Sequence, residues 1–256
     1  MTEVLSQMKD LGYQILGVRN FVSTDKPRIS TRSLVLRHDV DADMRAAARL
    51  AIWEQTLGVC STYLVMLQSP LYNLFSRDSC QTIDAILSAG HELGLHFDVA
   101  FNESRSQDLT DIIDSQAQAI SDFFSVPVTT FSAHQPTARA LDPESYTGSL
   151  VSCYTHPIMK RLAYFSDSNR EREIEQVVDL AKTQLTEPIE CAPGIQLLIH
   201  PMWWVYGNRE PADVWDRVLL SNLAGAQEQL ALTERAFGLP RQVKLTRLHD
   251  EGATST

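Results

Sequence analysis

The sequence predicts an α/β protein, built as a closed or nearly closed (β/α) barrel of about seven parallel strands. Short apolar runs typical of buried strands alternate with longer segments whose apolar residues recur at helical spacing. This alternation is typical of parallel strands joined by right-handed helical connections, and about seven such units favour a barrel over an open sheet. The 256 residues, 44% of them hydrophobic, can bury a full core, and without a linker-like segment or repeat we expect a single domain over residues 1–256.

The first half of the chain is expected to contribute four strands. A short amphipathic helix at 4–11 comes first, and a strand at 33–37 leads to a helix over 46–57. Gly58 ends that helix, since glycine readily adopts the backbone conformation that follows a helix. The later elements are a strand at 61–67, a helix around 83–87 closed by Gly90, a strand at 92–96, a helix at 109–124 and a strand at 128–132.

The second half has a weaker pattern. The stretch 138–148 shows no clear periodicity, and short strands are predicted after it at 150–154 and 162–166. A helix at 174–185 and a strand at 195–199 follow. Pro211 opens the last long helix, because proline suits the first helical position. The inner face of this helix is expected to carry Val214, Trp215, Val218 and Leu219.

The composition argues against several partners. The net charge is −10 and no Lys/Arg cluster is present, so nucleic acids and anionic membrane surfaces are not expected, because both are bound through basic patches. No segment approaches the roughly 20 apolar residues that span a bilayer, and the N-terminal segment has no basic leader. We therefore expect a soluble, cytoplasmic protein. The cysteines lack zinc-finger spacing and are expected to be reduced thiols: Cys60, Cys80, Cys153 and Cys191.

Reactive side chains gather where the predicted strands end. In a (β/α) barrel the C-terminal strand ends carry the active site. Four of the seven histidines stand at such ends, together with several aspartates, so we expect the site there. These residues are His38, Asp39, Asp41, His96, Asp98, His134, Asp167 and His200.

The acidic segment "DVDAD" has three possible interpretations. A calcium loop starting at Asp39 would need Gly at its sixth position and Glu at its twelfth, but Met44 and Leu50 stand there, which excludes it. Asp43 is interpreted as the N-cap of the following helix. Asp39 and Asp41 are two residues apart, so they share one face of a strand and can point into one site.

Several histidines and tryptophans have two possible roles each. In "HELGLH" the two histidines are five residues apart, so the segment does not match the HExxH zinc motif. If the segment is a strand, His91 and His96 lie on opposite faces. We therefore expect a structural His91 and a metal-binding His96. His134 is either a ligand or a hydrogen-bonded loop residue, and His200 is either catalytic or a core histidine. Two tryptophans after it, Trp203 and Trp204, are either core residues or a platform for a sugar ring.

The order of these segments resembles the polysaccharide deacetylase superfamily, the NodB-like domain, a metal-dependent deacetylase fold described as a distorted (β/α) barrel. The resemblance covers roughly residues 30–205. "LVLRHDVD" is similar to the family's first strand, and "AGHELGLH" to the segment that carries its metal histidines. "TTFSAHQP" falls where the family has an Arg-x-Pro-Tyr motif, and "LLIHP" is similar to the strand that ends in its catalytic histidine. The chain most resembles a divergent branch with the signatures "HDVD", "SDSN" and "HP-WW", often linked to surface-polysaccharide biosynthesis.

The resemblance implies roles for four residues. Asp39 would be the general base and His200 the general acid, with His96 as a metal ligand. Val40 occupies the position of the family's second aspartate, so the resemblance implies Asp41 as the carboxylate ligand, or an exchange of roles between Asp39 and Asp41.

Two further departures concern the second and third motifs. Ala100 stands where the family has its second metal histidine, and Ser132 lies in the region of the motif arginine. His134 is the obvious replacement ligand. The implied metal set is therefore Asp41, His96 and His134, with zinc the most suitable ion.

The expected function is hydrolysis of an N-acyl group on an amino sugar or a related small compound, in surface polysaccharide biosynthesis. Substrate contacts are assigned to Asp98, Asp167, Trp203 and Trp204. Two alternatives remain. The first is a catalytically degenerate metal- or carbohydrate-binding module, because the chain departs from the family pattern at three motif positions. The second is a cyclic amide or imide hydrolase on the same scaffold.

Overall fold

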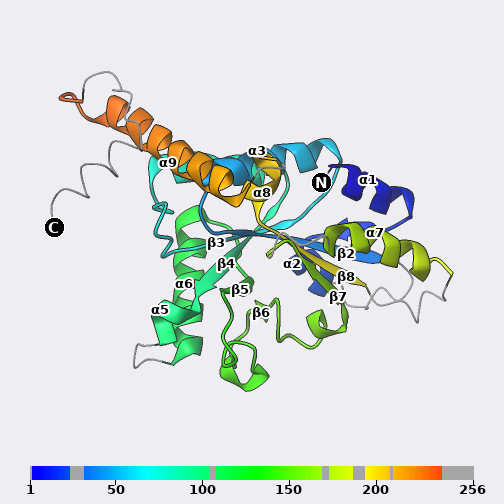
Figure 1. Ribbon diagram of the computed structural model, residues 1–256. Coiled ribbons are helices and arrows are strands. Elements are labelled where there is room, and N and C mark those ends of the chain that lie inside the picture. Colours follow the sequence, from blue (N-terminus) through cyan, green and yellow to red (C-terminus); the bar gives the residue numbers. More distant parts are fainter. Residues whose placement is uncertain are drawn as a thin grey trace.

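The computed structural model describes residues 2–23, 32–103, 108–168, 173–186, 194–207 and 210–237. All strands in these ranges pair in parallel within one sheet (Figure 1). They are β1 (Gln14–Leu16), β2 (Ser33–Val40), β3 (Thr62–Val65), β4 (Glu92–Asp98), β5 (Thr130–His134), β6 (Val151–Ser152), β7 (Ala163–Ser166) and β8 (Ile195–Ile199).

The strand order is that of an incomplete barrel. The sheet runs β6-β5-β4-β3-β2-β8-β7, and β1 pairs with the start of β2. Counted from β2, the strands follow in chain order to β6 on one side, and β8 and then β7 lie on the other. Within the described ranges β6 does not pair with β7, so the row of seven strands curls into part of a barrel. The predicted class, a distorted (β/α) barrel of about seven parallel strands, is confirmed.

The long helices cover the outer face of the sheet and bury two apolar clusters against it. One cluster joins the helices that follow β2, β3 and β4 to the outer side chains of β3, β4 and β5. The other joins the first helix and the helix after β7 to β2 and β8. The helices concerned are α1 (Thr2–Asp10), α3 (Met44–Thr56), α4 (Arg77–Ser88), α6 (Leu109–Phe124) and α7 (Glu173–Gln184).

Several short elements have no counterpart in the sequence prediction. They lie in connections where the apolar pattern is too short to show helical periodicity. They are β1, α2 (Val18–Val22), α5 (Val99–Glu103), α8 (Pro201–Val205) and the 3₁₀ turns η1 (Pro143–Ser145) and η2 (Met159–Arg161).

Alternation along β2 divides its side chains between the two faces. Leu34 and Leu36 pack into the outer cluster, whereas Val35 packs inside the barrel. Asp39 lies on the same face as Val35 and reaches the inner pocket. β2 also extends three residues past the predicted strand, so its polar end is part of the strand itself.

His38 faces outward, into a buried polar network beneath α3. Its Nε2 lies 2.8 Å from Oε1 of Glu54. The other Glu54 oxygen accepts hydrogen bonds from the hydroxyls of Ser61 at 2.7 Å and Tyr63 at 3.1 Å. His91 lies in the same network, with Nε2 3.0 Å from a backbone oxygen of α3, so its structural interpretation is confirmed.

The start of α3 confirms the interpretation of Asp43 as a helix cap. Its Oδ1 accepts a hydrogen bond from the backbone N–H of Ala46 at 3.0 Å, and its Oδ2 accepts one from the hydroxyl of Tyr206 at 2.6 Å. At the other end of α3, Gly58 has φ +63°, as expected for the residue after a helix.

The last helix, α9 (Pro211–Thr233), begins at Pro211 as predicted and extends beyond the sheet (Figure 1). Val214 and Val218 are buried, as expected. Leu219 is 39% exposed, so its placement on the inner face was wrong, whereas Trp215, equally exposed, contacts Trp203 of α8. The reason is that α9 contacts the body along a narrow strip rather than the broad stripe that the apolar pattern indicated.

Cys60, Cys80 and Cys153 are free thiols, in agreement with the prediction, and Cys191 lies outside the described residues. Among the helices of the described ranges, none combines the length and the apolar character that a membrane span requires.

Candidate active site

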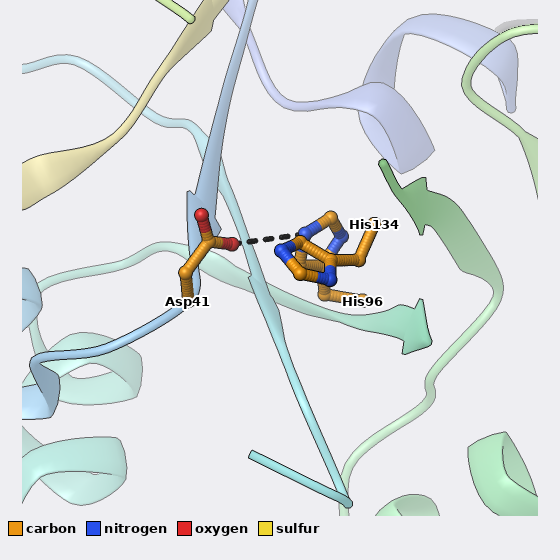
Figure 2. A group of neighbouring side chains, drawn as sticks. All are labelled: Asp41, His96 and His134. Carbon is orange, nitrogen blue, oxygen red and sulfur yellow. Dashed lines mark ion pairs between the residues drawn. The ribbon is translucent and has the colours of Figure 1, made fainter. Parts of the chain in front are cut away.

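Three strand ends bring Asp41, His96 and His134 together (Figure 2). Asp41 follows β2, His96 lies on β4 and His134 ends β5. One ligand atom from each residue lies within 4.8 Å of the others. His96 Nε2 is 3.0 Å from Asp41 Oδ1, and the two imidazole rings meet edge to face at 5.2 Å. The three residues predicted as metal ligands thus converge on one point.

The donor set fits a divalent first-row metal ion such as zinc. One carboxylate and two imidazoles are typical of a catalytic zinc site, which uses three protein ligands and leaves a position open. Burial raises the pKa of Asp41, but the nearby imidazoles of His96, His200 and His134 outweigh this and lower it below 3.8. Burial also lowers the pKa of His134, which favours the neutral imidazole that a metal requires.

Ser132 links His96 to Asp39 and thereby fixes the imidazole. Its hydroxyl donates to Asp39 Oδ2 at 3.2 Å and lies 2.7 Å from His96 Nδ1. Because that hydroxyl has only one hydrogen, we infer that Nδ1–H of His96 is the donor, which leaves Nε2 as the nitrogen that faces Asp41 and is available to a metal ion. Burial lowers the pKa of His96, but Asp39 and Asp41 outweigh this and raise it, so a bound metal would displace a proton.

Asp39 is almost fully buried, and its two oxygens differ in their surroundings. Oδ2 accepts the bond from Ser132 and lies 3.6 Å from His96 Nδ1 and 3.9 Å from Nη2 of Arg37. Oδ1 is buried without a hydrogen-bond partner among the described residues. Since Asp39 lines the pocket, one carboxylate oxygen is held and the other remains able to accept a proton.

His200 approaches the cluster from β8, with its Nε2 3.6 Å from Asp41 Oδ2. On the other side of the ring, Nδ1 lies 2.6 Å from Asp167 Oδ1, and the indole N–H of Trp204 donates to Asp167 Oδ2 at 2.8 Å. Burial lowers the pKa of His200, but Asp167, Asp41 and Asp39 outweigh it and raise this pKa to about 9. A pKa of about 9 favours the imidazolium form of His200 at neutral pH.

A pocket of about 290 Å³ surrounds these groups. Trp203 of α8 and Trp215 of α9 meet edge to face at 6.1 Å and form one wall. Gln135, just after His134, has φ 45°, a conformation uncommon for residues other than glycine. The lining residues are Asp39, Asp41, His96, Ala133, His134, Gln135, Pro136, Tyr154, Ser168, Leu198, His200, Met202, Trp203 and Trp215.

Three residues predicted to contact substrate lie outside this lining. Asp98 turns to the start of α5, where its Oδ1 accepts a hydrogen bond from the N–H of Phe101 at 3.1 Å. Asp167 and Trp204 lie behind His200 and contact each other. Their substrate contacts stay predictions, but the observed bonds give Asp167 a different role, that of holding His200. Trp203 is the predicted platform residue that does line the pocket.

Several residues of the site were not predicted from the sequence. Arg37 could have been found, since it shares the strand face of Asp39, and Ser132 was noted only as a departure from a motif. Trp215 was predicted only to lie on the inner face of its helix, because apolar spacing does not distinguish a core residue from a pocket residue. Gln135 and Ser168 directly follow the predicted residues His134 and Asp167 but have no charge of their own, and Tyr154 follows a strand without a charged residue.

No protein-family model matches the sequence, and no curated protein does. Three solved structures have a similar fold. The Xyl-CE4 domain of a multidomain xylanase from the hindgut metagenome of Trinervitermes trinervoides is 13% identical, over 86% of this chain and 90% of its own, with TM-score 0.42. The peptidoglycan deacetylase PdaC from Bacillus subtilis is 12% identical, over 88% and 93%, with TM-score 0.45. The chitin deacetylase from Colletotrichum lindemuthianum is 14% identical, over 74% and 82%, with TM-score 0.43. The functional assignment therefore depends on the residues of the site.

Proposed function

We propose that this protein is a metal-dependent hydrolase that removes an N-acetyl or similar N-acyl group from an amino sugar, as a member of the polysaccharide deacetylase superfamily. The observation that carries the proposal is the convergence, in one pocket, of the Asp41, His96 and His134 cluster with the free oxygen of Asp39 and with His200. These are the groups that amide hydrolysis needs: a place for a Lewis acid, a base and an acid.

Asp41, His96 and His134 would hold the ion. When bound, a divalent metal ion acidifies water and stabilises negative charge on a carbonyl oxygen. Asp39 accepts a proton from the attacking water at Oδ1, because Oδ2 is already engaged by Ser132. His200 donates a proton from Nε2 to the departing amine nitrogen as the C–N bond breaks, while Asp167 holds its Nδ1. Water is thereby added across the amide to give a carboxylic acid and an amine.

The pocket supports a small sugar substrate. Its volume of about 290 Å³ is at the lower end for small-molecule sites and suits a single sugar ring with its acyl group. Trp203 and Trp215 offer apolar faces of the kind on which a sugar ring can pack. We propose a sugar precursor of surface polysaccharide as the substrate, zinc as the ion, a single domain and a cytoplasmic location.

The test is purification of the full chain with its metal content measured, followed by assay of acetate release from N-acetyl amino sugars and of ring opening of cyclic amides. Asp39→Asn should retain the metal and lose on the order of 10²–10⁴-fold in kcat, the usual contribution of a general base. His134→Ala should lose the metal. The matched control is Asp122→Asn, an exposed aspartate on α6 outside the pocket lining.

Unchanged turnover in Asp39→Asn would overturn the catalytic assignment. Sugar binding without turnover would instead assign the binding-module alternative, and hydrolysis of cyclic amides alone would assign the cyclic amidase.

A further inference from the structure

Two aspartates, one on β2 and one directly after it, lie beside the same imidazole ring. Asp41 Oδ1 lies 3.0 Å from His96 Nε2, and Asp39 Oδ2 lies 3.6 Å from Nδ1 of the same ring. Both carboxylates are suitable ligands. Residue type and spacing therefore leave open which aspartate binds the metal and which acts as the base.

Arg37 distinguishes the two aspartates. It precedes Asp39 by two residues on β2, so both side chains point inside the barrel. Its guanidinium is fully buried, lies 4.5 Å from the ring centre of Tyr154 and 5.9 Å from that of Tyr164, and comes within 3.9 Å of Asp39 Oδ2. Among the described residues, Asp39 is the carboxylate in the one ion pair that Arg37 makes.

Movement of Asp39 onto the metal would break this buried pair. An unpaired charge in a protein interior is costly, and loss of one partner of a buried pair is strongly destabilising. The hydroxyl of Ser132 holds the same oxygen, Oδ2, so two contacts act together on one side of the carboxylate. Asp41, by contrast, is paired only with imidazoles in the described contacts.

We propose that Arg37 is a positioning residue that holds Asp39 away from the metal, so that Asp41 is the carboxylate ligand and Asp39 is left with one oxygen free. The proposal rests on the metal centre of the proposed function. In this proposal, a positive charge inside the barrel determines which aspartate binds the metal and which acts as the base.

The test uses cobalt as a spectroscopic probe in the full-length chain. In the wild type and in Asp39→Asn the visible Co²⁺ spectrum should be the same, since Asp39 is not a ligand. In Arg37→Met, Asp39 is released and should join the ion, so the spectrum should change toward a higher coordination number. The double variant R37M/D39N should regain the wild-type spectrum, and Arg37→Lys, which keeps a positive charge, should restore it in large part.

The kinetic expectation for Arg37→Met is a fall in kcat on the order of 10²-fold or more with KM nearly unchanged, because the base is displaced while the pocket is intact. Arg45→Met is the matched control, because Arg45 pairs with Asp78 and Glu228 on the outer helices. If Arg37→Met does not fold, Arg37→Gln gives the same readout, and R37M/D39N removes both buried charges together.

An unchanged cobalt spectrum in folded Arg37→Met or Arg37→Gln would overturn the proposal, as would loss of the wild-type spectrum in Asp39→Asn. A wild type that binds no cobalt would overturn both this proposal and the proposed function. A wild type that binds cobalt and hydrolyses no N-acyl compound would overturn the proposed function alone, because the spectral comparison does not need turnover.

Discussion

At the scale of single residues, the site consists of side chains that are each held on one side and free on the other. Ser132 holds Nδ1 of His96 and leaves Nε2 for a metal ion, and it holds Oδ2 of Asp39 and leaves Oδ1 for a proton. Asp167 does the same for His200 by contacting Nδ1. This arrangement fixes which atom of each residue faces the pocket before any substrate arrives.

We expect Asp167→Asn to lower kcat on the order of 10²-fold or more with little change in KM, because His200 loses the carboxylate that orients its ring and favours its charged form. Steady-state kinetics on the substrate found in the acetate assay measure both constants. Trp204→Phe removes only the outer hydrogen bond to Asp167 and should have a smaller effect. Equal losses in the two variants would show that packing, and not the carboxylate, supports His200.

At the scale of elements, the turn from β2 to α3 positions the carboxylate ligand. Asp41 lies in this turn, between the strand that carries Asp39 and the helix that Asp43 caps. Because Asp43 also accepts a hydrogen bond from Tyr206, the same side chain ties this turn to the segment after α8. The helix cap therefore also connects the two parts of the chain that carry Asp41 and His200.

Asp43→Ala is expected to lower the free energy of unfolding by about 1–2 kcal/mol, the usual cost of losing an N-cap. Denaturation by urea, followed by circular dichroism, measures this change. Asp43→Asn can still accept the bond from the N–H of Ala46 and is the matched control. A loss in Asp43→Asn as large as in Asp43→Ala would contradict the cap as the cause.

At the scale of the whole molecule, the sheet separates two polar systems. The inner face carries Asp39 and the candidate metal ligands, and the outer face carries the buried Glu54 network. The two systems begin at adjacent residues of β2, since His38 faces Glu54 and Asp39 faces the pocket. Glu54 joins α3 to β2 and β3 through His38 and Tyr63, so its loss should affect global stability without direct contact with the site.

We expect Glu54→Gln to lower the free energy of unfolding by about 1–3 kcal/mol at neutral pH, because buried hydrogen-bond partners lose their acceptor. Burial raises the pKa of Glu54, but His38, His91 and Ser61 outweigh it and lower this pKa below 4.5. A lowered folded-state pKa gives stability that is present above the unfolded value of about 4.3 and is lost as pH falls through the folded one.

The difference in unfolding free energy between wild type and Glu54→Gln should therefore be constant near neutral pH and shrink below about pH 4. Urea titrations at a series of pH values measure it. A difference that persists unchanged into acid would show that the carboxylate charge contributes nothing. Glu103→Gln, on the short α5, gives the baseline for loss of a carboxylate elsewhere.

The elements that follow apolar periodicity could be predicted from the sequence, and the others could not. The strand at 195–199 and the helix at 109–124 agree with the structure residue by residue, because a buried strand and an amphipathic helix each repeat a local pattern. The wrong placement of Leu219 arises because periodicity shows which face of a helix is apolar but not what covers it.

By itself, the sequence determined the long helices, the longer strands and the shared face of Asp39 and Asp41, since periodicity and alternation are local properties. It also placed His96, His134 and His200 at strand ends. Only the tertiary structure decided that His38 turns away to Glu54, that Asp167 lies behind His200, and that Arg37 lies against Asp39 over Tyr154. These contacts depend on the curvature of the sheet and on the packing of segments far apart in the chain, and no local pattern encodes them.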